Sequence, residues 1–400
     1  MPNISRKRCQ LCDNQHIQPI INHTDCVLSN RFLKKPDVRD EHRFQLTLGQ
    51  CQHCALLQLI NLPDPKELVS KFDWIVYREP EAHLDALTDR LLELPGINSQ
   101  SLIAGFTYKD DSLLKRLEYR LDCRAWRIDP LEDLAIVVKN AGSNSILPEL
   151  TIEKAKKIVE KNGLADIVIA RHIFEHAFDT QILLDIFQVL VKPNGYLIIE
   201  VPDSERSLSG LNYGMLWEEH ALYFTESTFK NAFCKTPFSP VEFISYCYSI
   251  ENVMLAILRY DNQIQESKPI KSEEFLRAEK YSKDVLSIKK KLHDYLSFRV
   301  NNNEKIAVFG AGHVSSIFID FMEIAPFISY VVDDDPNKIG LHMPGSRLPI
   351  IASEKILIEN ITCCLSGLSP ESEEKVINNN KSLFHKKGFF IPIAFLNKLI

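Results

Sequence analysis

The chain has few glycines, 14 in 400 residues, and no long apolar run. A membrane-spanning helix needs roughly 18 consecutive apolar residues, so we expect no membrane partner. The net charge is −6 and no long basic segment is present, which argues against nucleic acid as a partner. The first residues, Met1–Gln10, are polar and basic with no apolar signal region behind them, which favours a cytoplasmic protein.

Ten cysteines are too few for a disulfide framework in a chain of this length, so clustered cysteines indicate metal ligands. Cys9-x-x-Cys12 and Cys51-x-x-Cys54 each place two thiolates on one tight turn, and two such turns complete a tetrahedral zinc site. The alternative is four reduced cysteines without a metal. Because four protein ligands leave no open position, we predict a structural zinc ion in a module over residues 1–70. The segment between the two pairs is predicted to be an inserted loop.

The stretch 165–224 has the clearest pattern of secondary structure. An apolar run ends in Arg171-His172, as a buried parallel strand does where it meets a ligand crevice. A helical pattern over Gln181–Val191 is followed by the breakers Pro193 and Gly195, and a second buried strand covers Tyr196–Val201. Strand, helix and strand in this order predict an α/β fold with a doubly wound sheet.

Further elements extend this unit on both sides. A long amphipathic helix is predicted over 272–298, inside a charged linker that spans 263–303. This linker separates a central domain, 71–262, from a second α/β domain, 304–400. Within the central domain, we predict strands over 101–106, 241–248 and 252–259, and helices over 80–93, 112–121, 152–161 and 226–233.

Four short motifs of the central domain carry a family resemblance. Ala170-Arg171-His172-x-x-Glu175-His176 and Lys192-Pro193-Asn194-Gly195 resemble the segments that flank strands four and five in S-adenosylmethionine-dependent methyltransferases. Glu200-Val201-Pro202-Asp203 and Glu219-His220-x-x-Tyr223-Phe224 are similar to those of the sugar C-methyltransferases, which methylate a carbon of a nucleotide-linked deoxysugar. The resemblance runs the length of the chain. It implies a zinc-binding module, a class I methyltransferase-like domain and a C-terminal Rossmann-like domain, with a nucleotide sugar as substrate.

The resemblance also implies catalytic residues. Methylation of a carbon requires a nucleophile, which a keto-sugar supplies when a base removes the proton next to its carbonyl. We expect His220 to be this base, with Glu219 orienting it or sharing the role, and His176 to steady the enolate oxygen. A packing histidine or a surface histidine is the alternative in each case. A homo-oligomer is also compatible with the sequence.

Only one of the two parts of the S-adenosylmethionine-binding signature is kept in the sequence. The resemblance implies that S-adenosylmethionine contacts Gly105, Asp129, Arg171, His172 and Tyr77. Asp129 ends a strand at a distance from the preceding turn that suits a ribose hydroxyl pair. The turn itself, Gly105–Asp111, keeps one glycine and carries Tyr108 and Lys109 where small residues are expected. The alternative is therefore a degenerate relative that binds a nucleotide sugar or a partner protein without methyl transfer.

The C-terminal domain opens with a strand, the turn Gly310-Ala311-Gly312 and a helix, and the next strand is predicted over Ile328–Val332, ending in Asp333. Alone this is half of a dinucleotide fingerprint, so an NAD-dependent enzyme is a third hypothesis. The family has the same opening, followed by motifs that here contain Lys338 and Arg347. The resemblance implies that this side contacts the nucleotide sugar. The expected substrate-binding residues are Trp217, Tyr223, Gly310, Gly312, Lys338 and Arg347, with Trp217 standing where the family has tyrosine.

Overall fold

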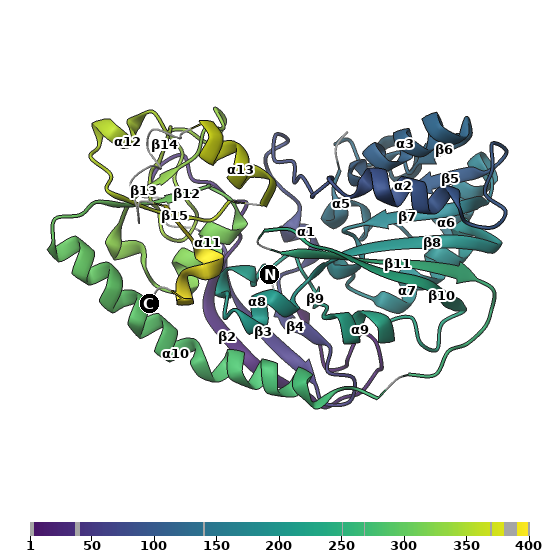
Figure 1. The fold of residues 1–400 in the computed structure, drawn as a ribbon, viewed down its shortest axis with the longest axis horizontal. Coiled ribbons are helices and arrows are strands. Elements are labelled where there is room, and N and C mark those ends of the chain that lie inside the picture. The colour runs from purple at the N-terminus through teal and green to yellow at the C-terminus, as the bar shows by residue number, and fades with distance from the viewer. Residues whose placement is uncertain are drawn as a thin grey trace.

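The computed structural model describes residues 4–36, 41–138, 141–249, 251–267, 269–368, 370–379 and 390–398. The described residues form three separate sheets, each built mainly from one part of the chain. In Figure 1 the N-terminal strands lie in the middle, the central α/β domain to the right and the C-terminal α/β domain to the left. None of the helices in these ranges is both long and apolar enough to cross a membrane.

The N-terminal sheet is antiparallel, with the order β1-β4-β3-β2 and β9 added beside β4. Its strands are β1 (Ile4–Ser5), β2 (Ile17–Val27), β3 (Arg43–Cys51) and β4 (Leu57–Leu62). The prediction of an inserted loop between the cysteine pairs was wrong, because β2 and most of β3 occupy that segment and pair with each other. Ile21, Leu46 and Leu48 are buried on these strands, so the apolar residues of the segment form a sheet instead of a solvated loop.

The central sheet has the order β10-β11-β8-β7-β5-β6. Strands β5, β6, β7 and β8 are parallel, and β11 runs antiparallel to both β8 and β10. These strands are β5 (Leu102–Gly105), β6 (Arg124–Arg127), β7 (Ala165–Arg171), β8 (Val191–Asp203), β10 (Phe238–Tyr246) and β11 (Asn252–Tyr260). The doubly wound α/β sheet predicted from the sequence is confirmed.

Helices cover both faces of the central sheet. One face packs with α2 (Leu84–Leu92) and α3 (Asp111–Leu121), through Leu87, Leu113 and Leu117. The other packs with α6 (Ile152–Asn162), α7 (Thr180–Leu190) and α9 (Glu226–Asn231). Because both faces are covered, β7 and β8 are apolar on both sides, which explains their near-continuous hydrophobic runs. Short helices fill the connections: α1 (Pro65–Leu68), α4 (Pro130–Leu134), α5 (Ser143–Ile146) and α8 (Glu205–Ser209).

The predicted turn Lys192–Gly195 lies at the start of β8 and does not precede it. The strand begins at Val191, directly after α7, and Asn194 adopts a left-handed conformation with φ of 64°. A Cβ on Gly195 would lie 2.9 Å from the Asp166 carbonyl oxygen, so this position requires glycine because β7 passes close by.

The long helix α10 (Ser272–Asn301) connects the central sheet to the C-terminal one, and Figure 1 shows it running beneath the N-terminal strands. The C-terminal sheet is parallel, with the order β14-β13-β12-β15-β16. Its strands are β12 (Ile306–Phe309), β13 (Ile328–Val332), β14 (Ile350–Ile351), β15 (Cys363–Ser366) and β16 (Phe390–Pro392). Helix α11 (His313–Phe321) follows β12, and α12 (Lys355–Ile358) and α13 (Pro370–Asn379) lie further on. One apolar core joins α10, the N-terminal sheet and α11 through Tyr281, Leu46 and Phe318.

Candidate active site and metal centre

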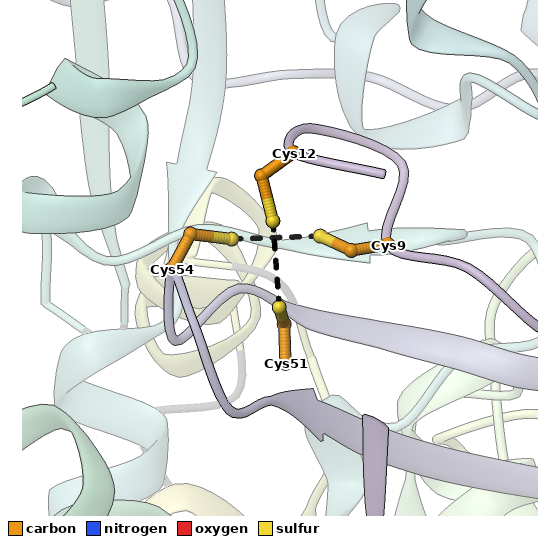
Figure 2. A group of neighbouring side chains, drawn as sticks. All are labelled: Cys9, Cys12, Cys51 and Cys54. Atoms are coloured by element: carbon orange, nitrogen blue, oxygen red, sulfur yellow. Dashed lines mark hydrogen bonds between the residues drawn. The ribbon is translucent and has the colours of Figure 1, made fainter. Parts of the chain in front are cut away.

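The four paired cysteines converge on one point, as Figure 2 shows. The Sγ atoms of Cys9 and Cys54 lie 3.4 Å apart, those of Cys12 and Cys51 lie 3.6 Å apart, and all four are within 4.8 Å of one another. Four thiolates at about 2.3 Å from a zinc ion have this mutual spacing. The sulfur ligands therefore fit zinc, and with four of them the site is closed, as a structural site is.

Each cysteine pair sits on the same type of turn. The amide of Asp13 donates to the Cys9 carbonyl at 3.0 Å, and the amide of Ala55 donates to the Cys51 carbonyl at 3.0 Å. Both residues have left-handed backbones, with φ of 57° and 56°. The thiolates of each pair thereby point to the same side of their turn.

The zinc module is joined to the central domain by backbone pairing. Strand β4 pairs with β9 (Leu222–Tyr223), in the register Leu57 to Tyr223. Cys9, Cys51 and Leu56 belong to the same buried cluster as the residues after β7. The module thus holds the segment that carries Trp217, Glu219 and His220.

Three buried side chains, those of His83, Arg171 and His172, surround one carboxylate at the ends of β7 and β8. Glu200 Oε2 accepts from Arg171 Nε at 2.9 Å and faces His83 Nε2 at 3.0 Å, and Glu200 Oε1 lies 3.0 Å from His172 Nε2. Burial would raise the pKa of Glu200, but Arg171 and His172 outweigh it and hold the pKa well below its usual range. The other Arg171 nitrogens donate to the carbonyls of Lys109 and Pro80. Each of the three side-chain nitrogens of Arg171 therefore takes part in fixing the strand ends.

The ring nitrogens of His172 likewise face carboxylates of the protein. Its backbone is left-handed, with φ of 51°, and its Nδ1 lies 3.3 Å from Glu175 and 3.6 Å from Glu79. Burial opposes the charged imidazolium, but Glu79 and Glu175 outweigh it and raise the pKa of His172 to about 10. At neutral pH this side chain is a cation held among carboxylates.

A cavity of about 170 Å³ lies where the connections after β5, β6, β7 and β8 meet the zinc module and the segment that follows it, 71–77. Its polar lining comes from all of these segments: Asn30, Tyr77, Lys109, Asn144, His176 and Glu219. Asn30 Oδ1, Asn144 Oδ1 and both ring nitrogens of His176 are buried without a hydrogen-bond partner in the part of the chain that the structure describes. Such atoms are costly unless a ligand or water completes them, so the cavity is the candidate active site.

The carboxyl group of Glu219 accepts three hydrogen bonds at the cavity. Its Oε1 accepts from the Tyr77 hydroxyl and from Asn30 Nδ2, each at 3.1 Å, and Oε2 accepts from Asn144 Nδ2. Burial and the neighbouring Glu218 nevertheless raise the pKa of Glu219 to about 8. This carboxyl group is therefore mostly protonated at neutral pH.

The histidines beside Glu219 are shifted in the opposite direction. The rings of His176 and His220 lie 4.9 Å apart, edge to face. Burial lowers the pKa of His176 well below its usual range, helped by Lys109, and burial together with His176 does the same for His220. Both imidazoles are neutral at neutral pH. His220 is the more exposed of the two.

Glu175, His176 and His220 also bring ligand atoms within 4.8 Å of one another, as a metal site does. The surroundings oppose a second cation there, because Glu175 already faces the His172 cation and because Lys109 acts electrostatically on both His176 and His220. We therefore interpret this group as acid–base machinery.

The turn after β5 holds no glycine-rich cradle. Asp110 accepts from the amides of Phe106 and Thr107 at 2.7 and 2.8 Å, and from the amide of Arg171 at 3.0 Å. A Cβ on Gly105 would lie 2.8 Å from Leu114 Cδ1, so the glycine is required by packing with α3. The exposed Asp129 ends β6 and caps α4, with its Oδ1 accepting from two amides.

The C-terminal domain reaches the cavity wall through His313, the first residue of α11. Its ring stacks on Trp217 with centroids 4.0 Å apart and an interplanar angle of 14°, and it meets the edge of Tyr77. Trp217 Nε1 donates to Ser29 Oγ, and the Tyr223 hydroxyl exchanges hydrogen bonds with the Trp217 backbone. One indole face is therefore covered by His313, and Tyr223 has a structural role in this conformation.

The other residues predicted to bind the substrate, Gly310, Gly312, Lys338 and Arg347, are not among those that line the cavity. The amide of Ala311 donates to Asp333 Oδ2 at 2.8 Å, and Lys338 Nζ lies 3.0 Å from the same oxygen. This use of Asp333 argues against a ribose contact and so against the NAD hypothesis. Arg347 lies 3.6 Å from Glu41. Gly310 has φ of 99° and lies close to the Gly367 carbonyl, whereas a Cβ on Gly312 would meet nothing within 4 Å.

Sequence reasoning did not find several of the site residues: Asn30, Glu79, His83, Asn144, Glu200 and His313. Most come from segments with no spacing relation to the motifs. Glu200 stood inside a quoted motif, and its place at the end of a buried strand could have indicated a paired carboxylate.

Comparison with known proteins gives three family models in succession along the chain. A zinc binding domain matches residues 9–68, a methyltransferase domain matches 110–242, and a C-methyltransferase C-terminal domain matches 259–393. The C-methyltransferase NovU of Streptomyces niveus is 22% identical over 413 residues, which cover 96% of this chain and 95% of that protein.

Solved methyltransferases match about half of the chain. The sarcosine dimethylglycine methyltransferase of Galdieria sulphuraria is 10% identical, covers 45% of this chain and 86% of its own, and has a TM-score of 0.29. The 1,6-didemethyltoxoflavin-N1-methyltransferase of Burkholderia thailandensis, solved with S-adenosylhomocysteine, is 11% identical, covers 46% and 80%, and has a TM-score of 0.31.

The sheet and the cavity at its carboxyl edge, together with the matched domains, define an S-adenosylmethionine-dependent methyltransferase with a class I fold. The predicted enzyme class is confirmed. The order of the three matched domains and the nearly full-length relative make the chain similar to the C-methyltransferases, with a cysteine-rich zinc module at the N-terminus.

The residues of the cavity fit the methyl donor of this class. A Cβ on Gly142 would meet only Tyr108 Cε1, at 3.9 Å, so the backbone on that side is open to a ligand. The unpartnered atoms of Asn144 and Asn30 supply acceptors. Tyr77, Asn144 and Lys109 are the residues that would hold the donor.

Proposed function

We propose that the protein transfers a methyl group to a carbon of a nucleotide-linked keto-deoxysugar through a base-generated enolate. The observation that carries this proposal is the cluster of Glu219 and His176, which line the cavity, with His220, whose ring lies 4.9 Å from that of His176. The pKa shifts within this cluster are opposed, with the pKa of Glu219 raised to about 8 and that of His220 lowered. Adjacent groups with pKa values pushed apart are the usual sign of a paired acid and base.

In the proposed mechanism His220 is the base. Its neutral imidazole accepts the proton from the carbon next to the substrate carbonyl, and the C–H electrons form the enolate double bond. Its partial exposure allows contact with a bound sugar, whereas His176 and Glu219 are buried deeper.

Glu219 serves as the acid. Protonated at neutral pH, it donates a hydrogen bond to the carbonyl oxygen as negative charge develops there. Tyr77 and Asn30 hold Oε1 and so fix the orientation of the carboxyl group. His176, with both nitrogens unpartnered within the described ranges, offers the oxygen a second polar contact.

Held by Tyr77, Asn144 and Lys109, the donor would supply an electrophilic sulfonium methyl group for the enolate carbon. The protein's contribution at that step is to exclude water and to hold the reacting carbon in line. The ring of Tyr77, which lines the cavity, packs on Trp217, and Trp217 stacks on His313, so that aromatic rings shield this side of the cavity from water.

The nucleotide sugar is proposed to enter between the central and C-terminal domains. Support comes from His313, which brings the C-terminal domain onto Trp217, and from the open backbone at Gly312 beside it. Gly312 precedes the N-terminus of α11, where a phosphate is stabilised by the helix dipole and free amides. The relative NovU is itself a C-methyltransferase, which supports carbon as the methylated atom.

Hydrogen exchange separates enolate formation from methyl transfer. The protein is incubated in D₂O with nucleotide-linked keto-deoxysugars and no methyl donor, and deuterium next to the carbonyl is followed by NMR. We expect exchange with the native protein, none with His220→Ala, and a gain of one methyl group when donor is added. Absence of both exchange and methylation across a panel of such sugars would rule out the proposal and favour a non-catalytic relative.

A further inference from the structure

The turn after β5 cannot bind an anion through its backbone. In a glycine-rich turn free amides do so, but here the amides of Phe106 and Thr107 donate to the Asp110 carboxylate. Asp110 is fully buried and also accepts from Arg171. The amino-acid tail of the methyl donor carries a carboxylate, so another group must neutralise it.

Two lysines of the described residues line the cavity, Lys71 and Lys109, and of these Lys71 is exposed and Lys109 is buried. The single helical turn Tyr108–Asp110, capped by the Thr107 side chain, directs it inward, and the Lys109 side chain is 4% exposed. Its Nζ lies 2.5 Å from Glu79 Oε1 and 3.5 Å from the His172 carbonyl oxygen.

Glu79 is its matched partner. The carboxylate is 19% exposed and lies between Lys109 and His172, both of which are cationic. Burial would raise the pKa of Glu79, but His172 and Lys109 outweigh it and lower the pKa to about 2. The two charges of the Lys109–Glu79 pair are therefore permanent at neutral pH.

We infer that the Lys109–Glu79 pair replaces the glycine-rich cradle and binds the zwitterionic tail of the methyl donor by exchange of partners. Lys109 takes the α-carboxylate and Glu79 takes the α-ammonium. Lys109 then pairs with the ligand carboxylate instead of Glu79, and Glu79 pairs with the ligand ammonium instead of Lys109. No buried ion is left unpaired in this exchange; an unpaired buried charge would be strongly unfavourable. The inference rests on the proposed function and names the residues that this chain uses where the family's glycines are missing.

Calorimetry with two ligands tests the inference. S-adenosylhomocysteine carries the complete tail, and 5′-methylthioadenosine lacks it. For Lys109→Gln we expect S-adenosylhomocysteine to bind on the order of 30-fold more weakly, the usual loss for a charge-assisted hydrogen bond, while methylthioadenosine changes less than about threefold. Lys109→Arg should retain most of the discrimination, and Glu79→Gln should weaken S-adenosylhomocysteine alone.

Lys115→Gln, an exposed lysine on α3, is the matched control and should change neither affinity. The inference is overturned if Lys109→Gln binds S-adenosylhomocysteine as tightly as the native protein or more tightly, because Lys109 would then only fill the space. It is also overturned if both ligands weaken equally in a variant that keeps its melting temperature. If the native protein binds neither ligand, both the inference and the proposed methyl transfer fail. If it binds both and only the Lys109 effect is absent, the proposed function stands.

Discussion

Replacement of Glu219 by glutamine separates the two roles that a carboxyl group could have in this site. Glutamine can still donate a hydrogen bond to the substrate oxygen, but it cannot accept a proton. With a pKa of about 8, Glu219 is about 90% protonated at pH 7 and about 10% protonated at pH 9. If its protonated form is the acid, the rate of enolate formation in the native protein falls about tenfold per pH unit above pH 8.

The assay is deuterium exchange next to the substrate carbonyl, measured from pH 6.5 to 9.5 without methyl donor. In Glu219→Gln we expect the alkaline decline to disappear and the rate at pH 7 to remain within about tenfold of the native rate. Glu160→Gln, an exposed carboxylate on α6, should leave the native profile unchanged. A native rate that rises through pH 8, together with loss of exchange in Glu219→Gln, would show that Glu219 is the base and refute the assignment of His220.

Three other predictions concern the zinc site, the domain contact and the indole wall. Cys54→Ala should lose zinc and at least several kcal/mol of unfolding free energy, since structural zinc in small domains contributes about 10–16 kcal/mol. Metal analysis and thermal unfolding measure the two losses. As a control, Cys247 is exposed and outside the zinc site, so Cys247→Ser should keep its zinc. Gly345→Ala should lower the melting temperature, because φ is 68° and the new Cβ would lie 2.9 Å from Val27 and 3.0 Å from Asp320. Gly96→Ala is the control: its backbone is also left-handed, but its Cβ would meet open space, so the melting temperature should fall less. Equal falls in the two variants would contradict the packing argument. His313→Ala should raise the KM for the sugar nucleotide on the order of tenfold, since a stacked contact of this kind contributes roughly 1 kcal/mol. The rate of deuterium exchange at saturating sugar nucleotide should be retained. An unchanged KM would show that the C-terminal domain does not contribute to the substrate site.

Local patterns predicted most of the regular structure. The predicted strand over Ile328–Val332 is β13 residue for residue, and the first residue of α10 is the expected Ser272. These segments depend on short-range periodicity and on nearby breakers, which a sequence displays directly. The pairing of β2 with β3 was missed because it is set by contacts between segments that flank a long turn, and not by the cysteine spacing beside them.

The candidate site could be predicted only where a motif carried it. The four zinc ligands and the trio His176, Glu219 and His220 followed from spacing and from the resemblance. Asn30, Glu79 and His313 come from three distant segments, and only tertiary packing brings them to Glu219, Lys109 and Trp217, respectively. Charge balance explains the rest, since the buried Lys109 and Arg171 could not be tolerated without Glu79 and Glu200.

Strand β9 directly follows His220, and β4 supplies its antiparallel partner through Leu57 and Tyr223. A chain without its metal would therefore also hold the segment of His220 less firmly. If His220 is the base that we propose, zinc occupancy sets the fraction of molecules that are active.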